Sequence, residues 1–296
     1  MPTLTVITPA FNAERFLAET IESVLNQDVP GLEYIIVDGG STDGTVDVIR
    51  KYEKHLAWWV TEKDRGQAHA FNKALARATG EFVAEADADD VYLPGALHAA
   101  LDMLHTTPGA RWVAGGVLGF GTADVPYHDW HMPNVPTSLL DCVTARFQAA
   151  TPGHVWSREM IQAVGGYDES MRYLFDFELF ANLLWHGERC FALERPVAAY
   201  RFHPESKSVK EADSFEAEWD VIRDRYVPRL PFQQRIIARH RIAMRRSGAQ
   251  YSVAARELAD GHAGDARRRF ARAIMSYPPS LLSRSGLGCA RRLAVG

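Results

Sequence analysis

The chain has 296 residues, a hydrophobic fraction of 47%, a charged fraction of 24% and a formal net charge of −4. These proportions are ordinary for a globular enzyme, and the length allows one large domain or a domain with an appendage. No run reaches the length of about 18 apolar residues that a membrane-spanning helix needs, which excludes such a helix. The three cysteines form no paired motif and no signal peptide is visible, so we expect a protein of the reducing cytoplasm without a thiol-metal site.

Strand and helix patterns alternate over the first 117 residues. Short apolar runs predict strands, and apolar residues at helical spacing between them predict helices. The predicted strands are 4–8, 32–37, 57–61, 81–86 and 111–117, and the helices between them are 13–26, 45–54, 67–78 and 94–106. This alternation is typical of an α/β protein with a doubly wound, mostly parallel sheet and helices on both faces.

The chain after residue 117 is less regular. The predicted elements are a long loop at 118–137, helices at 157–164 and 175–186, a strand at 190–200, and two helices at 233–246 and 251–275. Long loops inside compact domains are often functional.

Candidate ligand-binding residues follow the first four predicted strands. They are Thr8 to Phe11, Asp38, Glu62 to Gly66, and Asp87 to Asp90. Ligands of such sheets bind beyond the carboxyl ends of the strands. Four strand ends therefore direct polar groups to one crevice.

Four carboxylates lie within six positions after the fourth predicted strand, at Glu85, Asp87, Asp89 and Asp90. Such a cluster is costly to desolvate, and a divalent cation with hard oxygen ligands is the usual compensation. In an extended segment Asp87 and Asp89 project to the same side, with Asp90 turned away. That arrangement suits a metal ion that holds a diphosphate. The alternative is a solvated acidic loop that caps the helix at 94–106.

A glycine-rich segment, VDGGSTDGT, occupies residues 37–45. Its glycines permit tight turns and close approach of a ligand. Asp38 can accept hydrogen bonds from a base edge or a ribose, whereas Ser41 and Asp43 fit local capping of the next helix. The dinucleotide motif GxGxxG and the phosphate loop GxxxxGK[ST] are both missing from the sequence. A cation held by carboxylates remains the simple way to neutralise a diphosphate here.

Together these motifs resemble those of the family 2 inverting glycosyltransferases, which have the GT-A fold. The matching segments, in the order of the family, are VITPAFN at 6–12, VDGGSTDGT at 37–45, EKDRGQAHAFNKALARATGE at 62–81, DADDVYLPGAL at 87–97, GGYDESMRYLFDFEL at 165–179 and YRFHPESKS at 200–208. The resemblance implies a GT-A catalytic domain at 1–210. Its nucleotide-sugar-binding half would be 1–95 and its acceptor-binding half 96–210.

The resemblance also implies which residues bind the nucleotide-sugar donor. These are Thr8, Pro9 and Phe11 at the base and ribose, Asp38 as an acceptor from the base, Arg65 and Gln67 near the diphosphate, and Asp87 facing the ribose or a metal-bound water. Asp89 would bind a Mn²⁺ or Mg²⁺ ion as part of the DXD motif of the family, and His203 would approach that metal or the diphosphate.

The general base implied by the resemblance is Asp176. Relatives often have Glu-Asp at this position, whereas this chain has Phe175-Asp176. The activity implied is transfer of a sugar, with inversion, from a nucleotide-diphosphate sugar to a hydroxyl of a glycan or lipid-linked acceptor, as in polysaccharide and cell-envelope biosynthesis. A nucleotidyltransferase of similar fold and a non-catalytic subunit that binds nucleotide sugars are the alternatives.

The C-terminal extension predicted at 211–296 is helical and basic. From Arg223 to Gly296 it has 16 Arg, no Lys and 4 acidic residues, so this segment carries +12 and residues 1–222 carry −16. Two interpretations stay open, namely binding to an anionic membrane surface and packing as a helical cap on the catalytic domain. The first would make the protein peripheral on the inner face of a membrane. Nucleic acid is not an expected partner, because stacking aromatic residues are sparse in the extension.

Overall fold

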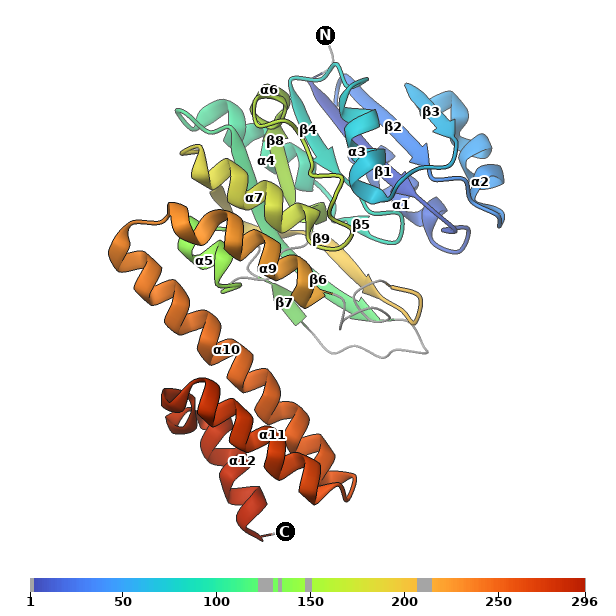
Figure 1. The fold of residues 1–296 in the computed structure, drawn as a ribbon. Coiled ribbons are helices and arrows are strands. Elements are labelled where there is room, and N and C mark those ends of the chain that lie inside the picture. Colours follow the sequence, from blue (N-terminus) through green and yellow to red (C-terminus); the bar gives the residue numbers. More distant parts are fainter. Residues whose placement is uncertain (1–2, 122–129, 133–134, 147–150, 207–214, 296) are drawn as a thin grey trace. The chain divides into compact units, whose positions relative to one another are not determined.

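The apolar runs of the chain form one sheet, which the computed structural model describes together with its covering helices (Figure 1). The structure describes residues 3–121, 130–132, 135–146, 151–206 and 215–295. The chain divides into two compact units, Met1–Tyr226 and Val227–Gly296. The helix that ends at Tyr226 therefore belongs to the first unit. The sequence pattern assigned it to the extension at 211–296.

The described strands form a mixed sheet. They are β1 Leu4–Ala10, β2 Leu32–Asp38, β3 Trp58–Thr61, β4 Phe82–Glu85, β5 Val91–Tyr92, β6 Trp112–Gly121, β7 Trp130–Met132, β8 His154–Ser157 and β9 Phe191–Phe202. Their order across the sheet is β3-β2-β1-β4-β8-β6-β9-β5, and β7 pairs with β6. The strands β1 to β4 are parallel, and β9 is parallel to β6, whereas β5, β7 and β8 run antiparallel to their neighbours. The parallel pattern expected from the sequence thus holds in the N-terminal half, and β8 reverses direction beside β4.

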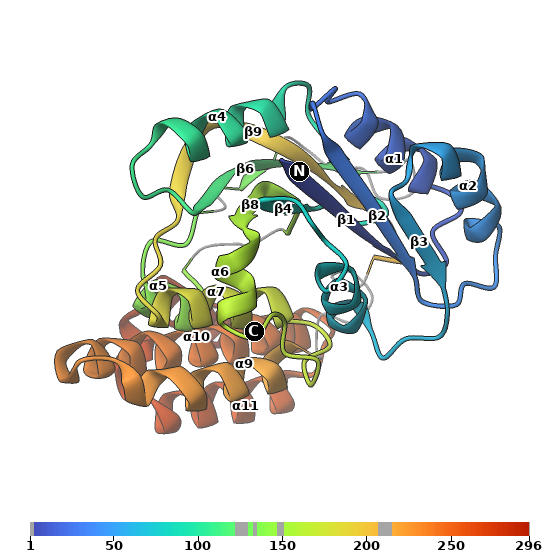
Figure 2. The same cartoon turned by 90° about the horizontal axis from the view of Figure 1, so that it is seen from above.

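Helices cover both faces of the sheet in the first unit. They are α1 Leu17–Leu25, α2 Thr45–Tyr52, α3 Gln67–Leu75, α4 Ala96–Thr106, α5 Leu139–Val143, α6 Arg158–Ala163, α7 Phe175–Trp185 and α9 Phe215–Tyr226, with 3₁₀ turns η1 Glu53–His55 and η2 Thr151–Gly153. Figure 2 shows α1, α2 and α4 on one face and α3, α6 and α7 on the other.

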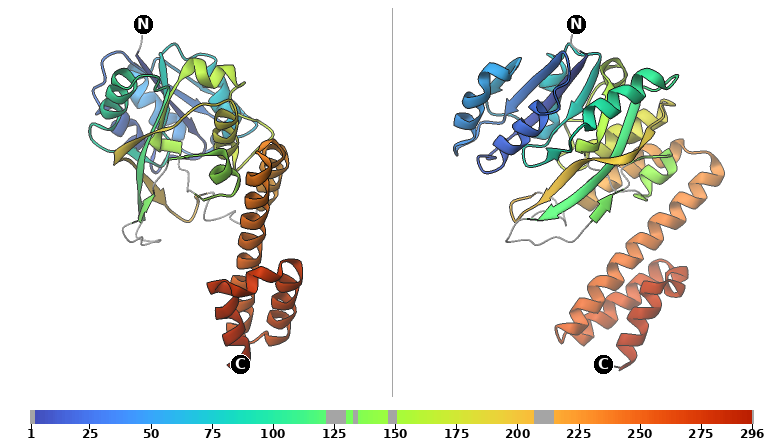
Figure 3. Two further views of the ribbon diagram at one scale, coloured as in Figure 1. Left: turned by 90° about the vertical axis from the view of Figure 1, so that its left-hand side faces the viewer. Right: turned by 180° about the vertical axis from the view of Figure 1, so that it is seen from behind.

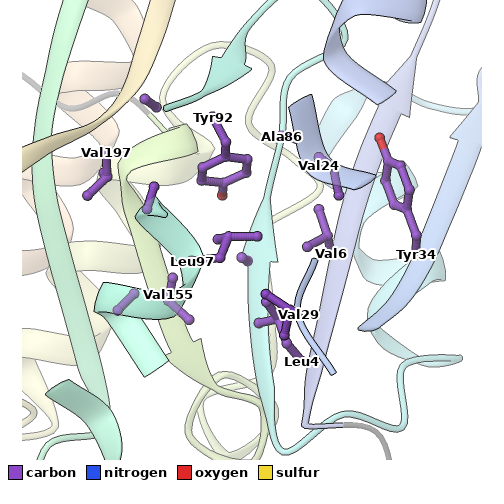
Figure 4. Packing of buried hydrophobic residues seen from close by; sticks show 14 of the residues in the cluster. Leu4, Val6, Val24, Val29, Tyr34, Ala86, Tyr92, Leu97, Val155 and Val197 are labelled. Carbon is purple, nitrogen blue, oxygen red and sulfur yellow. The ribbon is translucent and has the colours of Figure 1, made fainter. Parts of the chain in front are cut away.

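The main core lies between the sheet and the helices α1 and α4. On β1, Leu4 and Val6 point into it, and on β4 Ala84 does the same, because alternate residues of a strand share a face. Ile21 and Val24 of α1 complete this layer and are fully buried. Figure 4 shows Leu4, Val6 and Val24 in this cluster together with Tyr34, Tyr92 and Leu97. This packing fixes the ends of β1, β2 and β4 as one rigid edge.

The loop predicted at 118–137 is wrong in part. The strand β6 continues to Gly121, and β7 occupies 130–132. Residues 122–129 and 133–134 lie outside the described residues. The long strand β9 pairs along β6 and ends at Phe202, directly before His203.

The second unit is a small helical assembly. It contains η4 Val227–Arg229, α10 Phe232–Ala259, α11 Ala263–Ser276, η5 Pro278–Leu282 and α12 Arg284–Val295. The helices α11 and α12 pack beside α10 around Tyr251, Ala266 and Cys289 (Figure 3). The helix predicted at 251–275 is wrong, because α10 continues to Ala259 and Gly261, at φ 83°, turns the chain into α11. Within the described part of the chain, no helix combines the length and the apolar character that a membrane crossing requires.

Candidate active site

The loop after β1 is tied to the glycine-rich loop after β2. Asn12 has a left-handed backbone with φ 50°, and its side-chain oxygen accepts from the amide of Thr42 at 2.9 Å. The amide of Asn12 donates to the Ser41 hydroxyl at 2.7 Å. Thr8 is buried and shares a 2.9 Å hydrogen bond with the Tyr34 hydroxyl, while the Phe11 side chain is 64% exposed. Phe11 is thus available for contact with a flat ligand at the sheet edge.

Asp38 ends β2 in a fully buried position with several protein partners. Its Oδ2 accepts from the amides of Gly40 and Ser41 at 3.2 and 3.0 Å. The Thr61 hydroxyl donates to the same oxygen at 2.5 Å, and the Ser41 hydroxyl donates to Oδ1. These contacts orient the carboxylate and shape the glycine-rich turn. A role toward a nucleobase stays a prediction.

Gln67 and Asp87, both predicted at the donor site, are in direct contact. Gln67 is the first residue of α3, and its Nε2 donates to Asp87 Oδ1 at 2.6 Å. Arg65 lies two residues earlier with a side chain that is 68% exposed, and it forms an ion pair with Glu169. Glu169 also accepts from Asn72 at 3.0 Å. The loop that holds Glu169 is therefore connected to α3 and to Arg65.

Asp89 and His203 meet although 114 positions separate them in the sequence. The Nε2 of His203 lies 2.9 Å from Asp89 Oδ2, and the two side chains are 10% and 33% exposed, respectively. The ring of Phe16 packs 4.8 Å from the imidazole of His203. The structure thus brings together the two residues that the resemblance assigns to a metal.

Arg201 supports the same pair. It is not among the site residues predicted from the sequence. Its Nε donates to the backbone oxygen of Asp89 at 2.8 Å, and its amide donates to Asp90 Oδ1 at 2.7 Å. The guanidinium lies between the rings of Phe16 and Phe120, at 4.6 and 4.3 Å from their centroids. The signal was present in the segment YRFHPESKS, two residues before His203.

Glu85 and Asp90 are the buried members of the acidic cluster, each 1% exposed. Burial, with the charges of Asp87 and Asp176, raises the pKa of Glu85 well above its usual value. Burial, with the charges of Asp89 and Asp87, likewise raises the pKa of Asp90. Neither carboxylate oxygen of Glu85 has a hydrogen-bond partner among the described residues. Both pKa values are raised in part because carboxylates crowd this strand end, an arrangement that a bound cation would relieve.

Asp176 lies in the first turn of α7, on the face of the sheet that α3 also covers. It is partly exposed, and its Oδ1 accepts from the amide of Phe177 at 2.7 Å. Its neighbour Phe175, which replaces the common glutamate, is buried against Phe71 and Tyr167. The phenyl ring thus anchors the start of α7 by packing.

His154 has the contacts of a structural residue. Its Nδ1 accepts from the indole of Trp112 at 2.9 Å, and its ring stacks on Trp156 and Phe180. Burial lowers the pKa of His154 to about 3, so the imidazole is neutral. These contacts make His154 part of the packed core that joins β6, β8 and α7.

The donor set at Asp89 and His203 fits a divalent ion that shares its coordination with a substrate. No group of three or more His, Cys, Asp or Glu that could hold a metal occurs among the residues that the structure describes. Mg²⁺ and similar ions commonly use one or two carboxylates and take their other ligands from phosphates and water. A carboxylate and an imidazole 2.9 Å apart meet that requirement.

Sequence comparison identifies relatives over most of the first unit. The family model described as "Glycosyl transferase family 2" matches residues 5–150. The "Putative teichuronic acid biosynthesis glycosyltransferase TuaG" of Bacillus subtilis is 29% identical over 246 residues, which cover 79% of this chain and 91% of TuaG. The "GalNAc(5)-diNAcBac-PP-undecaprenol beta-1,3-glucosyltransferase" of Campylobacter jejuni is 38% identical over 101 residues, which are 33% of each chain.

Solved structures share the fold at low sequence identity. The mannosyltransferase PcManGT from Pyrobaculum calidifontis, solved with GDP-Man and Mn²⁺, superposes with a TM-score of 0.62 at 21% identity over 99% of this chain and 86% of PcManGT. The S. aureus protein TarS 1-349, solved with UDP, has a TM-score of 0.57 at 19% identity over 94% of this chain and 90% of TarS 1-349. The family match and the shared sheet lead to one conclusion: residues 5–150 of this chain form a domain of glycosyl transferase family 2, and the chain has a GT-A fold followed by a helical C-terminal region.

Proposed function

We propose that the protein transfers a sugar, with inversion, from a nucleotide-diphosphate sugar to a hydroxyl of a glycan or lipid-linked acceptor. The observation that carries the proposal is the contact of Asp89 with His203 at 2.9 Å, beside the contact of Gln67 with Asp87 at 2.6 Å. Two pairs of residues distant in sequence thus converge at the carboxyl ends of the central strands, where α/β sheets bind their ligands.

The donor would lie along the loops after β1, β2 and β4. Thr8, Pro9 and Phe11 would contact the base and ribose, and Asp38 would accept from the base. Gln67 and Asp87 would face the diphosphate and ribose, held by their mutual hydrogen bond. Arg65 is exposed and paired with Glu169, so it can exchange that carboxylate for a phosphate oxygen without desolvating a new surface.

Asp89 and His203 would hold a Mn²⁺ or Mg²⁺ ion. The bound ion would supply charge stabilisation for the departing phosphates. Arg201 keeps Asp89 in place from behind through the backbone contact at 2.8 Å. PcManGT, which shares the fold, was solved with Mn²⁺, which supports the use of a divalent ion.

Asp176 would act as the general base. Its partly exposed carboxylate can take the proton of the acceptor hydroxyl while that oxygen attacks the anomeric carbon opposite the leaving diphosphate. The hydrogen bond from the Phe177 amide fixes Oδ1 and so orients the carboxylate. No covalent intermediate on the enzyme is needed for a single inverting displacement.

The name of TuaG, a teichuronic acid biosynthesis glycosyltransferase, supports a polymer of the cell envelope as the product. The location that we propose with this function is the cytoplasm, at the inner face of the membrane. The alternative of a nucleotidyltransferase is less favoured, because no basic glycine-rich loop follows β1. A non-catalytic subunit is less favoured because Asp87, Asp89 and Asp176 are all present.

The substitution Asp176→Asn tests the proposal. It should lower nucleoside diphosphate release from the best nucleotide sugar by about 10²–10⁴-fold, the usual contribution of a general base. The thermal shift given by UDP or GDP with Mn²⁺ should persist. Asp102→Asn, an exposed change on α4, is the control and should behave like the unaltered chain. Full activity of Asp176→Asn would end the assignment of the base.

A further inference from the structure

A carboxylate from α9 holds the chain directly before α7. Glu218 Oε1 accepts from the amide of Arg172 at 2.6 Å. Its Oε2 accepts from the amides of Tyr173 and Leu174 at 2.9 and 2.7 Å. Three consecutive backbone N–H groups thus converge on one carboxylate, two residues before Asp176. Such a concave arrangement of amides is a strong anion site, and here a side chain of the same chain fills it.

The start of α7 needs this support, because the residue at its cap supplies none. The residue before the helix is Leu174, which has no side-chain capping hydrogen bond. The first amides of a helix have no intrahelical partner and are usually satisfied by Ser, Thr, Asp or Asn at the cap. Glu218 meets the amides just before the helix with a negative charge, which also suits the positive end of the helix dipole.

A second contact joins the same two helices. Glu178, which is 2% exposed, accepts at Oε1 from the Tyr226 hydroxyl at 2.7 Å and from Arg225 at 2.5 Å. Arg225 also donates to Asp168 at 2.9 Å. Burial opposes the charge of Arg225, but the Asp168 and Glu178 carboxylates raise its pKa above the ordinary value. The helix α9 thus contacts the chain on both sides of Asp176, at 172–174 just before α7 and at Glu178 within α7.

We propose that α9 positions the general base of this glycosyltransferase, with Glu218 as the main positioning residue. The inference rests on the proposed role of Asp176. Glu218 orders the backbone that leads into Asp176, and Arg225 and Tyr226 fix the helix one turn later. Displacing a reacting group by about 1 Å costs roughly 100-fold in rate, so loss of this anchor should act on turnover.

Loss of the Glu218 contacts should lower turnover and leave donor binding nearly unchanged. The residues assigned to the donor, such as Asp38, Gln67 and Asp87, lie on β2, α3 and the loop after β4. Asp38 accepts from Thr61 and Gln67 donates to Asp87, and neither of these contacts involves α9. Glu218→Ala should therefore lower kcat by about 10- to 100-fold while the KM for the donor changes less than about twofold. Glu218→Gln keeps one acceptor oxygen and should give an intermediate loss.

The experiment compares Glu218→Ala, Glu218→Gln, Asp176→Asn and the unaltered full-length chain. Asp224→Asn, an exposed carboxylate of the same helix, is the matched control. Nucleoside diphosphate release is followed with the best substrate of a panel containing UDP-GlcNAc and GDP-mannose with Mn²⁺, well below the Tm of every variant. Binding of UDP and GDP is measured in parallel by thermal shift.

The expected pattern is a graded loss of kcat from Gln to Ala, with nucleotide binding retained and Asp224→Asn unchanged. Normal kcat in both Glu218 variants, with Asp176→Asn inactive, would overturn the positioning role and leave the proposed function intact. Loss of nucleotide binding together with kcat would also overturn it, because Glu218 would then support the whole fold. Full activity of Asp176→Asn would instead remove the general base on which the inference depends.

Discussion

Single residues at the ends of β4 and β9 define the site. Asp89 and His203 face each other, whereas Glu85 and Asp90 of the same acidic cluster are buried in the sheet edge. A buried carboxylate resists ionisation, so Glu85 and Asp90 contribute less charge than their number indicates. The chain thus separates the acidic groups that we propose contact a ligand from the acidic groups that shape the strand end.

His154 gives a prediction on stability at the same scale. Its folded pKa of about 3 lies below the ordinary value of 6.5, so the unfolded chain binds a proton that the folded chain rejects. The contribution of His154 to the free energy of unfolding is largest above pH 6.5 and is lost as the pH falls toward the folded pKa. Each pH unit below 6.5 in this range lowers the free energy of unfolding by about 1.4 kcal/mol.

The variant His154→Asn keeps an acceptor for the Trp112 indole but has no group that titrates in this range. Its free energy of unfolding should therefore fall less steeply between pH 6 and pH 4 than that of the unaltered chain, by about 1.4 kcal/mol per pH unit. Urea unfolding of the first unit at several pH values measures the slope. Equal slopes in the two proteins would show that His154 is protonated in the folded state.

Much of the candidate site could be predicted from the residue types and their order in the sequence. The alternation of Asp87 and Asp89 predicted a shared direction, and the segment around His203 matched the family pattern. Sequence could not reveal that Arg201 sits between Phe16 and Phe120, because these three residues come from distant segments. Tertiary contacts of this kind have no local signature.

At the scale of elements, the pairing of β6 with β9 determines where His203 lies. The two strands run in parallel from Val113 to Gly121, with irregular register around Gly115 and Gly116. A Cβ atom on Gly115 would lie 2.4 Å from Val197 Cγ1 and 3.0 Å from the Arg195 backbone oxygen. Only glycine lets the strands approach this closely.

The variant Gly115→Ala should therefore lower the stability of the first unit by about 1–3 kcal/mol, the usual cost of overpacking. Thermal and urea unfolding measure the change. Val197→Ala removes the nearest obstacle, so Gly115→Ala should cost less in the Val197→Ala background than alone. If both backgrounds lose the same stability, the side chain of Val197 is not what excludes a Cβ atom.

The helices and strands with strong apolar periodicity were predictable within a few residues. The C-terminal half of β6 was not, because the run GGVLGFG is rich in glycine, which weakens strand patterns. The turn between α10 and α11 was also missed, since Gly261 lies within a long stretch of helix-forming residues. In both places packing against neighbours overrides local preference.

At the scale of the whole molecule, charge distinguishes the two units. Residues 227–296 contain 14 Arg and 3 acidic residues. Large apolar side chains are exposed on the same unit at Met275, Leu282 and Leu287. Arg284, Leu287 and Arg291 are exposed at helical spacing on α12. Basic helices with exposed apolar residues favour an anionic membrane surface.

Flotation with vesicles tests this partner. The full-length chain should bind vesicles that contain phosphatidylserine at low salt and bind less at 0.5 M salt, since each Arg near such a surface contributes about 1 kcal/mol. Reversal of charge at Arg272, Arg284 and Arg291 to Glu should abolish the binding. Equal binding to neutral phosphatidylcholine vesicles, or none to either kind, would argue against an electrostatic membrane role.

The most direct measurement is the affinity of UDP and GDP for the full-length chain with and without Mn²⁺, compared with Asp89→Asn. A ligand at 100 times its Kd stabilises the folded state by about 2.7 kcal/mol, which a thermal shift detects readily. The account predicts a shift that needs both nucleotide and metal and that Asp89→Asn removes, while the exposed control Asp102→Asn keeps it. A nucleotide shift of equal size without Mn²⁺ and in Asp89→Asn would contradict a donor site built on a cation at this strand end.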